Sequence, residues 1–585
     1  MRIAIIHKEK CKPSACGHVC AKSCPVNRKI AREENTEACV KIEDKCKIDE
    51  SLCIGCGICQ NRCPFGAIEI VNLPAIEEEN LIFRYSENSF ALYGLPIPKE
   101  GSVLGLLGRN GIGKSTAIDI LSGRKKINLG KTFKDEEEQN KAIKDFFKGN
   151  ELTRYFESLK NKKVAYKIQN LSSLAVDLKV IDLLEKRGSK KRIEELAEKL
   201  NIKHLLESKL NKLSGGELQK VAIIASVLGE ADIYFFDEPL AYLDISERLR
   251  ISEFIKEIAK DKTVIVIEHD LLILDYLTNF INVFYGQQGC FGSVSGIKAT
   301  KYGINSYLSG FLKEENLRIR DKEINFNFTK NKQTAGKQIA EWPSFKIDFD
   351  KFKLDVQKGD IRENNVIGIL GKNGTGKTSF VKALAGLEEV HLNGKKQKLN
   401  LKLDISYKPQ YLASDSEDTI MDIIRKEKIS KKTASMFNLE FLHLKKVKQL
   451  SGGELQRFSI ARCLSKEADI YLLDEPSAYL DVEERISCAK AIKEMMNEKQ
   501  KTAFVVDHDL LLISYLADSI LVFSGESGKH GKASEVLDFE EGLGVLLKEL
   551  DITLRKDKES GRPRINSRGS VLDREQKEED KWAIF

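Results

Sequence analysis

One order of motifs occurs twice along this chain of 585 residues, and this repeat is the strongest constraint on its fold. VLGLLGRNGIGKST and VIGILGKNGTGKTS each place a GxxxxGK[ST] loop directly after an apolar strand. The backbone N–H groups of such a loop surround phosphate oxygens, its lysine reaches the terminal phosphates, and its hydroxyl meets magnesium at a helix N-terminus. We therefore predict two α/β units with ATP-binding phosphate loops. The predicted ATP-binding residues are Gly108, Asn110, Gly111, Gly113, Lys114, Ser115 and Thr116, then Gly371, Asn373, Gly374, Gly376, Lys377, Thr378 and Ser379.

Each half also has an apolar strand that ends in two acids, Asp237 and Glu238 in IYFFDEP and Asp474 and Glu475 in IYLLDEP. The aspartate suits magnesium coordination together with the loop hydroxyl, and the glutamate suits polarising an attacking water. A helix cap would explain one acidic pair, but not the same pair at matching distances in both halves.

A third motif, LSGGELQ, follows in each half and predicts a second anion site at a helix N-terminus. Its residues are Ser214, Gly215, Gly216 and Glu217, then Ser451, Gly452, Gly453 and Glu454. His269 and His508 come later, just past a strand, in IEHD and VDHD.

The halves differ by an insertion. The first half has 22 extra residues between Lys114 and Gln169 compared with Lys377 and Gln410. Apolar residues at helical spacing on either side of Lys148 predict a helix-loop-helix at about 131–160. We favour a docking element over a plain surface elaboration, although its seven basic and seven acidic residues indicate no nucleic-acid role by charge alone.

Ten of the thirteen cysteines fall within the first 63 residues, which favours metal binding over a disulfide framework. CIGCGICQNRCP has the CxxCxxCxxxCP spacing, in which three thiolates hold one 4Fe-4S cluster and the fourth reaches a neighbouring cluster. A second run has looser spacing, so we predict two clusters. The first has Cys11, Cys16, Cys20 and Cys63 as ligands, and the second has Cys24, Cys53, Cys56 and Cys59. Zinc is the alternative metal, although it usually takes two separated CxxC pairs. Cys39 and Cys46 are interpreted as free thiols.

The composition adds limits on partners. The net charge of +7 is compatible with a polyanionic partner but equally with an ordinary charged surface. No run of 18 apolar residues predicts a transmembrane helix, and MRIAIIHKEK does not resemble a secretory signal. We predict a cytoplasmic protein with no membrane partner.

The motif set as a whole resembles the ATP-binding-cassette ATPases. The resemblance implies that Gln169 and Gln410 sense magnesium and water, and that His269 and His508 are switch histidines on the γ-phosphate. It also implies two composite sites, one between Lys114 and Ser451 and one between Lys377 and Ser214. Adenine would stack on Tyr85 and Trp342 by position, although either could equally be a packing residue.

The cysteine-rich head, the two cassettes, the insertion, NLRIR and GRPRIN together resemble one subfamily, the RNase L inhibitor or ABCE ribosome-recycling ATPases. This implies a monomer that binds ribosomes, chiefly the small subunit with its rRNA and protein, beside a release-factor-like partner. ATP-driven closure would then move a rigid iron-sulfur head and separate the subunits. The short N-terminus favours an archaeal source.

The predicted domains are a ferredoxin-like head (1–73), the first cassette (74–309), a hinge (310–322), the second cassette (323–548) and a C-terminal hinge segment (549–585).

Some positions depart from the family pattern. Ile168 and Asn170 flank Gln169, Leu240 replaces a usual serine, and Lys220 replaces an arginine after LSGGELQ. These changes leave the hydrolysis residues intact and fall where the two sites are expected to be coupled. The alternative functions are an ATP-coupled electron-transfer protein, a DNA-repair cassette ATPase and a transporter subunit. The chain has no recognisable flavin or nicotinamide site, no long heptad run and no membrane element to support them.

Overall fold

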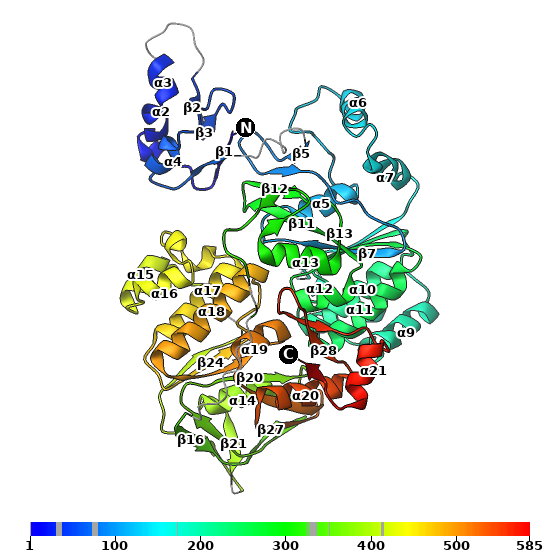
Figure 1. Cartoon of the computed structure of the whole chain (residues 1–585), viewed down its shortest axis with the longest axis vertical. Helices are drawn as coiled ribbons and strands as arrows, with labels where there is room; N and C mark the ends of the chain where they lie inside the picture. The colour runs from blue at the N-terminus through cyan, green and yellow to red at the C-terminus, as the bar shows by residue number, and fades with distance from the viewer. Residues whose placement is uncertain are drawn as a thin grey trace.

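The computed structural model describes residues 2–30, 38–72, 80–171, 174–324, 326, 336–349, 351–392, 394–410 and 415–584. Along the chain lie a small head (2–72), a first cassette (80–309), a second cassette (336–548) and a C-terminal segment (549–584), as Figure 1 shows. The predicted boundary at residues 73 and 74 lies outside the described residues. No helix in the described ranges is both long and apolar enough to cross a bilayer.

The head is made of short elements around its cysteines. Strand β1 pairs with β4 and β2 pairs with β3, both antiparallel. The head elements are β1 (Arg2–Ile6), α1 (Pro13–Cys16), α2 (Val19–Ser23), α3 (Pro25–Ile30), β2 (Val40–Ile42), β3 (Cys46–Ile48), α4 (Ile58–Arg62) and β4 (Ile68–Asn72). Because the helices are so short, sulfur-bearing side chains make up much of its buried core.

The first cassette is an α/β unit on one twisted sheet, with the described strands in the order β5-β6-β12-β11-β7-β10-β9-β8. Strands β11, β7, β10, β9 and β8 run parallel, so their carboxyl ends meet at one edge. The strands are β5 (Leu81–Arg84), β6 (Ala91–Tyr93), β7 (Ser102–Leu107), β8 (Val164–Lys167), β9 (Ile233–Asp237), β10 (Thr263–Ile267), β11 (Phe280–Gln287), β12 (Phe291–Val294) and β13 (Lys298–Ala299). The helices are α5 (Lys114–Leu121), α6 (Glu136–Phe146), α7 (Glu151–Leu159), α8 (Val180–Leu184), α9 (Lys190–Lys199), α10 (Gly215–Val227), α11 (Ile245–Ala259), α12 (Leu271–Leu277) and α13 (Thr300–Ser309).

Helices α6 and α7 stand where the spacing predicts a helix-loop-helix. Each begins with a side-chain cap, from Asp135 and Asn150 respectively. Phe147 and Leu152 are buried against the first cassette, and the Tyr155 hydroxyl donates to the carbonyl of Leu121 at 2.7 Å.

The second cassette repeats the same parallel core, here β26-β20-β25-β24-β23. Its strands are β16 (Gln338–Trp342), β17 (Phe345–Phe349), β18 (Phe352–Val356), β19 (Gly359–Arg362), β20 (Val366–Gly371), β21 (Glu389–Leu392), β22 (Lys395–Lys398), β23 (Ile405–Lys408), β24 (Ile470–Asp474), β25 (Thr502–Val506), β26 (Ser519–Glu526) and β27 (His530–Asp538). Its helices are α14 (Lys377–Leu384), α15 (Ile420–Lys426), α16 (Lys431–Met436), α17 (Gly452–Ser465), α18 (Val482–Lys499), α19 (Leu510–Leu516) and α20 (Phe539–Leu550).

The C-terminal segment, red in Figure 1, returns from the second cassette and lies against the first. Arg562, whose side chain is fully buried, and Arg564 both bind the Asp275 carboxylate in α12, at 3.0 and 2.6 Å. The segment therefore connects the two cassettes a second time. Its elements are β28 (Leu554–Lys556), β29 (Pro563–Ile565), α21 (Val571–Glu578) and β30 (Ala583–Ile584), and the hinge has β14 (Phe311–Leu312) and β15 (Leu317–Arg318).

Candidate nucleotide sites and cysteine centre

A helix begins at the lysine of each phosphate loop. Gly113 and Gly376 precede α5 and α14 with φ of 96° and 97°, a left-handed conformation that favours glycine. The Lys114 ammonium donates to the carbonyls of Gly108 and Arg109, both at 2.7 Å. Burial lowers the pKa of Lys114 to about 8, and the pKa of Lys377 is lowered to about 8 for the same reason. Each loop therefore offers a helix N-terminus and a desolvated ammonium group to an anion.

The acidic pair at the end of each central strand is buried. Burial and the neighbouring Glu475 raise the pKa of Asp474 to about 6. The Thr378 hydroxyl lies near enough to favour its charged form, but neither carboxylate oxygen has a hydrogen bond of ordinary geometry. A buried carboxylate with unused oxygens beside a hydroxyl is suited to hold a magnesium ion. In the first cassette, Asp237 is placed likewise beside Ser115.

The glutamate that follows is held by the glutamine and histidine that the family resemblance singles out. Gln169 Nε2 lies 2.8 Å and His269 Nε2 lies 3.4 Å from Glu238 Oε1. Burial alone would raise the pKa of Glu238, but His269 and Gln169 lower it to about 2. The carboxylate is therefore charged at neutral pH, as a group that orients water must be.

The second cassette repeats this arrangement. His508 Nε2 lies 3.5 Å from Glu475 Oε1, and His508 and Gln410 lower the pKa of Glu475 to about 2 against the effect of burial. Both glutamates have a left-handed backbone, with φ of 46° for Glu238 and 47° for Glu475.

The LSGGE serines cap their helices. The Ser214 and Ser451 hydroxyls accept from the backbone N–H of Glu217 and Glu454, and the carboxylate of each glutamate accepts from the backbone N–H of its serine. One cleft of about 2270 Å³ between the cassettes is lined by both LSGGE segments and by residues of both phosphate loops, including Asn110 and Lys377. Lys377, Ser214 and Ser451 therefore line one cleft together with Asn110 of the first phosphate loop, whereas Lys114 is not among the residues that line it.

The cassettes touch each other through the loops that precede α11 and α18. Asp244 Oδ2 accepts a 2.7 Å hydrogen bond from the backbone N–H of Asn373 in the opposite phosphate loop. Asn373 Nδ2 also donates to the carbonyl of Tyr242 at 3.3 Å. The family resemblance implies that Tyr242–Asp244 and Tyr479–Asp481 belong to coupling loops between the two sites, and these bonds give the first of those loops a physical contact.

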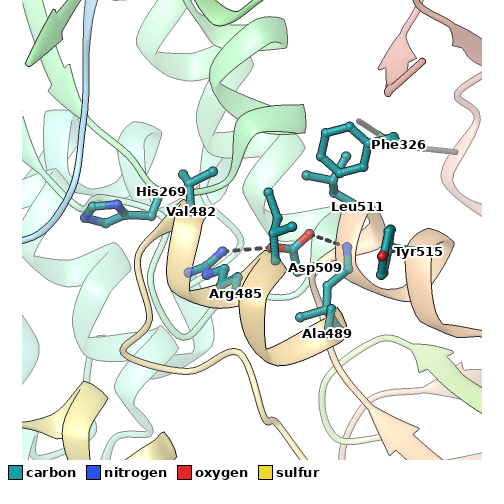
Figure 2. A pocket seen from close by; sticks show the side chains of 10 residues that line it. His269, Phe326, Val482, Arg485, Ala489, Asp509, Leu511 and Tyr515 are labelled. Atoms are coloured by element: carbon teal, nitrogen blue, oxygen red, sulfur yellow. Dashed lines mark hydrogen bonds and ion pairs between the residues drawn. The ribbon is translucent and has the colours of Figure 1, made fainter. Parts of the chain in front are cut away.

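A small cavity lies between the cassettes, lined by His269 of the first cassette, by side chains of α18 and α19 of the second, and by Phe326 (Figure 2). Arg485 binds Asp509 at 2.9 Å and also donates to the carbonyl of Leu480 at 2.9 Å. Arg248 makes the matching bonds to Asp270 and Leu243 in the first cassette, at 2.7 and 2.8 Å. Each arginine therefore connects the loop before α11 or α18 to the residue that follows His269 or His508.

The departures in the first cassette have visible consequences. Ser477 Oγ donates to Asp507 Oδ1 at 2.7 Å, whereas Leu240 at the matching position cannot donate. Glu268 Oε2, buried at the position that matches Asp507, has no hydrogen-bond partner among the residues that the structure describes. Lys220 keeps an ion pair at 3.1 Å, with Glu247, comparable to Arg457 with Glu484. Ile168 and Asn170 are exposed beside the cleft.

The structure corrects one aromatic assignment. Tyr85 is half exposed, and its hydroxyl lies 3.0 Å from Thr116 Oγ1 at the start of α5. Trp342 is only 1% exposed, donates to the carbonyl of Gln357 and packs on Phe380, so it has no open face for adenine and the prediction for it is wrong. Phe349, which is 40% exposed, is the last residue of β17, the first strand of the matching hairpin in the second cassette. Trp342 instead ends β16, which pairs with β19, and its ring belongs to the buried core of the second cassette.

The cysteines of the head converge. A small cavity is lined by all four predicted ligands of the second cluster, Cys24, Cys53, Cys56 and Cys59. Thiols around an apolar cavity fit an iron-sulfur cluster. Cys39 also lines this cavity, and Cys46 Sγ lies 3.9 Å from Cys20 Sγ, so the two cysteines interpreted as free thiols lie among the ligands. The spacing of Cys39 and Cys46 did not predict this position, because it results from the pairing of β2 with β3.

The head rests on the first cassette through polar contacts. Arg84 binds both oxygens of Glu50 at 2.9 and 2.6 Å. Glu69 Oε2 accepts from Gln287 and from the Cys290 thiol, at 2.9 and 2.6 Å.

Comparisons with known proteins agree with this geometry. The family described as "ABC transporter" matches residues 98–241 and 354–478, and "Possible Fer4-like domain in RNase L inhibitor, RLI" and "4Fe-4S binding domain" match 1–29 and 46–69. The chain is 39% identical to "Translation initiation factor RLI1" of Chaetomium thermophilum, over 98% of this chain and 96% of that protein. The chain belongs to the RNase L inhibitor, or ABCE, family.

Other ABCE-like proteins match over similar lengths. An uncharacterised ABC transporter ATP-binding protein of Methanocaldococcus jannaschii is 44% identical over 100% of this chain and 97% of its own length. The structure described as "Model of ribosome-bound archaeal Pelota and ABCE1" matches with a TM-score of 0.92 and 44% identity, covering 100% of this chain and 99% of that one. A complex of archaeal stalk protein aP1 with archaeal ribosome recycling factor aABCE1 matches with a TM-score of 0.80 and 43% identity, covering 87% and 99%. The fold is thus two ABC cassettes behind an iron-sulfur head.

Proposed function

We propose that this chain is an ATP-driven ribosome recycling factor, which separates ribosomes into subunits after termination or stalling. The observation that carries the proposal is the likeness to ribosome-bound archaeal ABCE1, which extends over the full chain. Its partners are then the ribosome, chiefly the small subunit, and a release-factor-like protein of the kind that Pelota represents in that structure. The work would be done in the cytoplasm by a single copy of the chain.

ATP hydrolysis is assigned to two composite sites. Lys114 with Ser451, and Lys377 with Ser214, hold one triphosphate each, because each phosphate loop shares the cleft with the opposite LSGGE. Ser115 with Asp237, and Thr378 with Asp474, would hold magnesium, which neutralises charge on the phosphates. Glu238 and Glu475 orient water, Gln169 and Gln410 fix these glutamates, and His269 and His508 face the γ-phosphate. Tyr85 and Phe349 supply the aromatic face for adenine.

The head acts as a rigid domain. A domain of about 70 residues has little core of its own, so cross-links through two 4Fe-4S clusters would stiffen it. The ligands are Cys11, Cys16, Cys20 and Cys63 for one cluster and Cys24, Cys53, Cys56 and Cys59 for the other. Because the head rests on the first cassette, closure of the cassettes would carry it against the ribosome.

The same proposal divides the chain into the head (1–73), the first cassette (74–309), the hinge (310–322), the second cassette (323–548) and the C-terminal hinge segment (549–585). Arg562 and Arg564 support the hinge role of the last part, because they bind Asp275 of the first cassette.

The test is ribosome splitting followed by sedimentation, with ATP, with a non-hydrolysable analogue and without nucleotide. We expect subunits only with ATP and a release-factor-like partner, and retention on the small subunit with the analogue. Cys56→Ser should abolish splitting while ATP hydrolysis remains measurable, and Glu238→Gln with Glu475→Gln should trap ATP. Intact ribosomes under every condition would overturn the proposal, and reversible cluster reduction that changes with nucleotide would favour electron transfer instead.

A further inference from the structure

A buried lysine precedes each predicted glutamine by two residues. Lys167 is the last residue of β8 and Lys408 is the last residue of β23. Their side chains are 2% and 1% exposed. In the described part of the chain neither lysine forms an ion pair with a carboxylate, which is unusual for a buried ammonium group. The question is what these two groups bind.

Lys167 binds the backbone of the acidic pair. Its Nζ donates to the carbonyl of Asp237 at 2.9 Å and to the carbonyl of Glu238 at 3.2 Å. Gln219, in LSGGELQ, donates from Nε2 to the same Glu238 carbonyl at 2.5 Å. One carbonyl of the catalytic segment is therefore held by two buried side chains from two different elements.

The second cassette has the same contacts. Lys408 Nζ donates to the carbonyls of Asp474 and Glu475 at 2.7 and 3.2 Å, and Gln456 Nε2 donates to the Glu475 carbonyl at 2.5 Å. The cassettes differ in loop length and in their coupling loops, yet this contact is kept. The corresponding distances in the two cassettes agree to within 0.2 Å.

The geometry of these bonds decides what they do. The carbonyl of Asp237 belongs to the peptide plane before the Glu238 Cα, and the carbonyl of Glu238 belongs to the plane after it. A group that binds both oxygens therefore restrains both φ and ψ of Glu238. This matters because Glu238 and Glu475 have φ of 46° and 47°, a left-handed backbone that is strained for a residue other than glycine and persists only where its surroundings hold it.

We propose that Lys167 and Lys408 are positioning residues, which hold the backbone of Glu238 and Glu475 in this conformation and so aim each carboxylate at the attacking water. The inference rests on the proposed ATP hydrolysis. Gln219 and Gln456 share the task. Gln219 and Gln456 also belong to the helices that begin at LSGGE. A shift of either helix would therefore move the backbone of the glutamate in the same cassette.

The test is the double variant Lys167→Met with Lys408→Met in the full chain loaded with its clusters. Methionine keeps the length and the apolar stem but cannot donate. We expect kcat for ATP to fall about 10²-fold, the loss typical of a misplaced catalytic group, while KM and the affinity for a fluorescent ATP analogue stay nearly unchanged. The matched control is Lys163→Met with Lys402→Met, two exposed lysines near the same strands, which should keep wild-type kcat.

A second readout separates positioning from general damage. In a chain that already carries Glu238→Gln and Glu475→Gln, the lysine variants should cause no further loss of residual hydrolysis, because there is no carboxylate left to aim. An additive loss, or a wild-type kcat in the lysine variants, would overturn the inference.

If the double lysine variant does not fold, Gln219→Leu with Gln456→Leu replaces it and should show the same kcat loss and the same lack of additivity; wild-type kcat or additivity there would also overturn the inference. A wild-type chain without ATPase activity would instead contradict the proposed function.

Discussion

The carboxylate of Asp481, at the start of α18, accepts a 2.9 Å hydrogen bond from the backbone N–H of Asn110 in the opposite phosphate loop. Asp244 makes the equivalent bond to Asn373 at 2.7 Å. Each cassette thus contributes an anion that touches the phosphate loop of the other, and Arg485 links the Asp481 loop to Asp509. A change at one site can therefore reach the other through direct contacts.

This relationship predicts an effect across the cassettes. In a chain with Glu475→Gln, only the site of Lys114 can hydrolyse ATP. Asp481→Ser in that background should lower the remaining turnover about tenfold, because serine keeps the helix cap but is too short to reach Asn110. Asp244→Ser is the matched control, since it touches only the blocked site. Equal loss in the two variants, measured as steady-state phosphate release, would contradict this assignment.

The buried aspartates between the cassettes predict a pH dependence of stability. Burial and the nearby Asp509 raise the pKa of Asp270 to about 6, above the value of an unfolded aspartate. The folded state therefore binds the proton more tightly, and the free energy of unfolding should fall as pH rises from about 4 through about 6. Asp270→Asn keeps the cap on α12 and removes the charge, so this part of the pH slope should disappear. Denaturant unfolding at pH 4.5, 5.5 and 7 checks it; an unchanged slope in the variant would refute it.

The hydrogen bond of Ser477, which Leu240 cannot make in the first cassette, predicts a loss of stability when it is removed. Ser477→Ala removes a 2.7 Å hydrogen bond to the buried Asp507 and should cost about 1–2 kcal/mol of unfolding free energy. Ser435→Ala, at an exposed serine of α16, should change it by less than about 0.5 kcal/mol. If Ser477→Ala lowered the free energy of unfolding no more than Ser435→Ala does, the bond to Asp507 would contribute nothing measurable.

The C-terminal segment predicts a large effect from one carboxylate. Asp275→Ala leaves the fully buried Arg562 without its acid, and removal of one partner of a buried pair costs about 3–5 kcal/mol. Replacement of the exposed Asp580 by alanine, which breaks a surface pair with Lys548, should leave the thermal midpoint nearly unchanged. If Asp275→Ala also left the midpoint unchanged, the segment would not hold the cassettes together.

Much of the site could be predicted from the sequence. The phosphate loops, the acidic pairs and LSGGE are contiguous motifs, and the structure places Lys114 and Lys377 at helix starts and Glu238 and Glu475 at strand ends as those motifs require. Buried strands and helix caps follow from residues close in the chain. The helices at 136–146 and 151–159 follow from apolar spacing in the same way.

The chemistry of each motif could be predicted from local sequence alone, because a phosphate loop or a cysteine run is built from neighbours whose spacing fixes their geometry. Which motifs and side chains contact one another depends on the packing of the whole fold. Trp342 is buried while Phe349 is exposed, Cys39 and Cys46 join the ligand thiols, and Lys167 binds the backbone of residues 237 and 238. These contacts join segments far apart in the chain, and no local pattern of residues records them, because they depend on how whole sheets and helices pack.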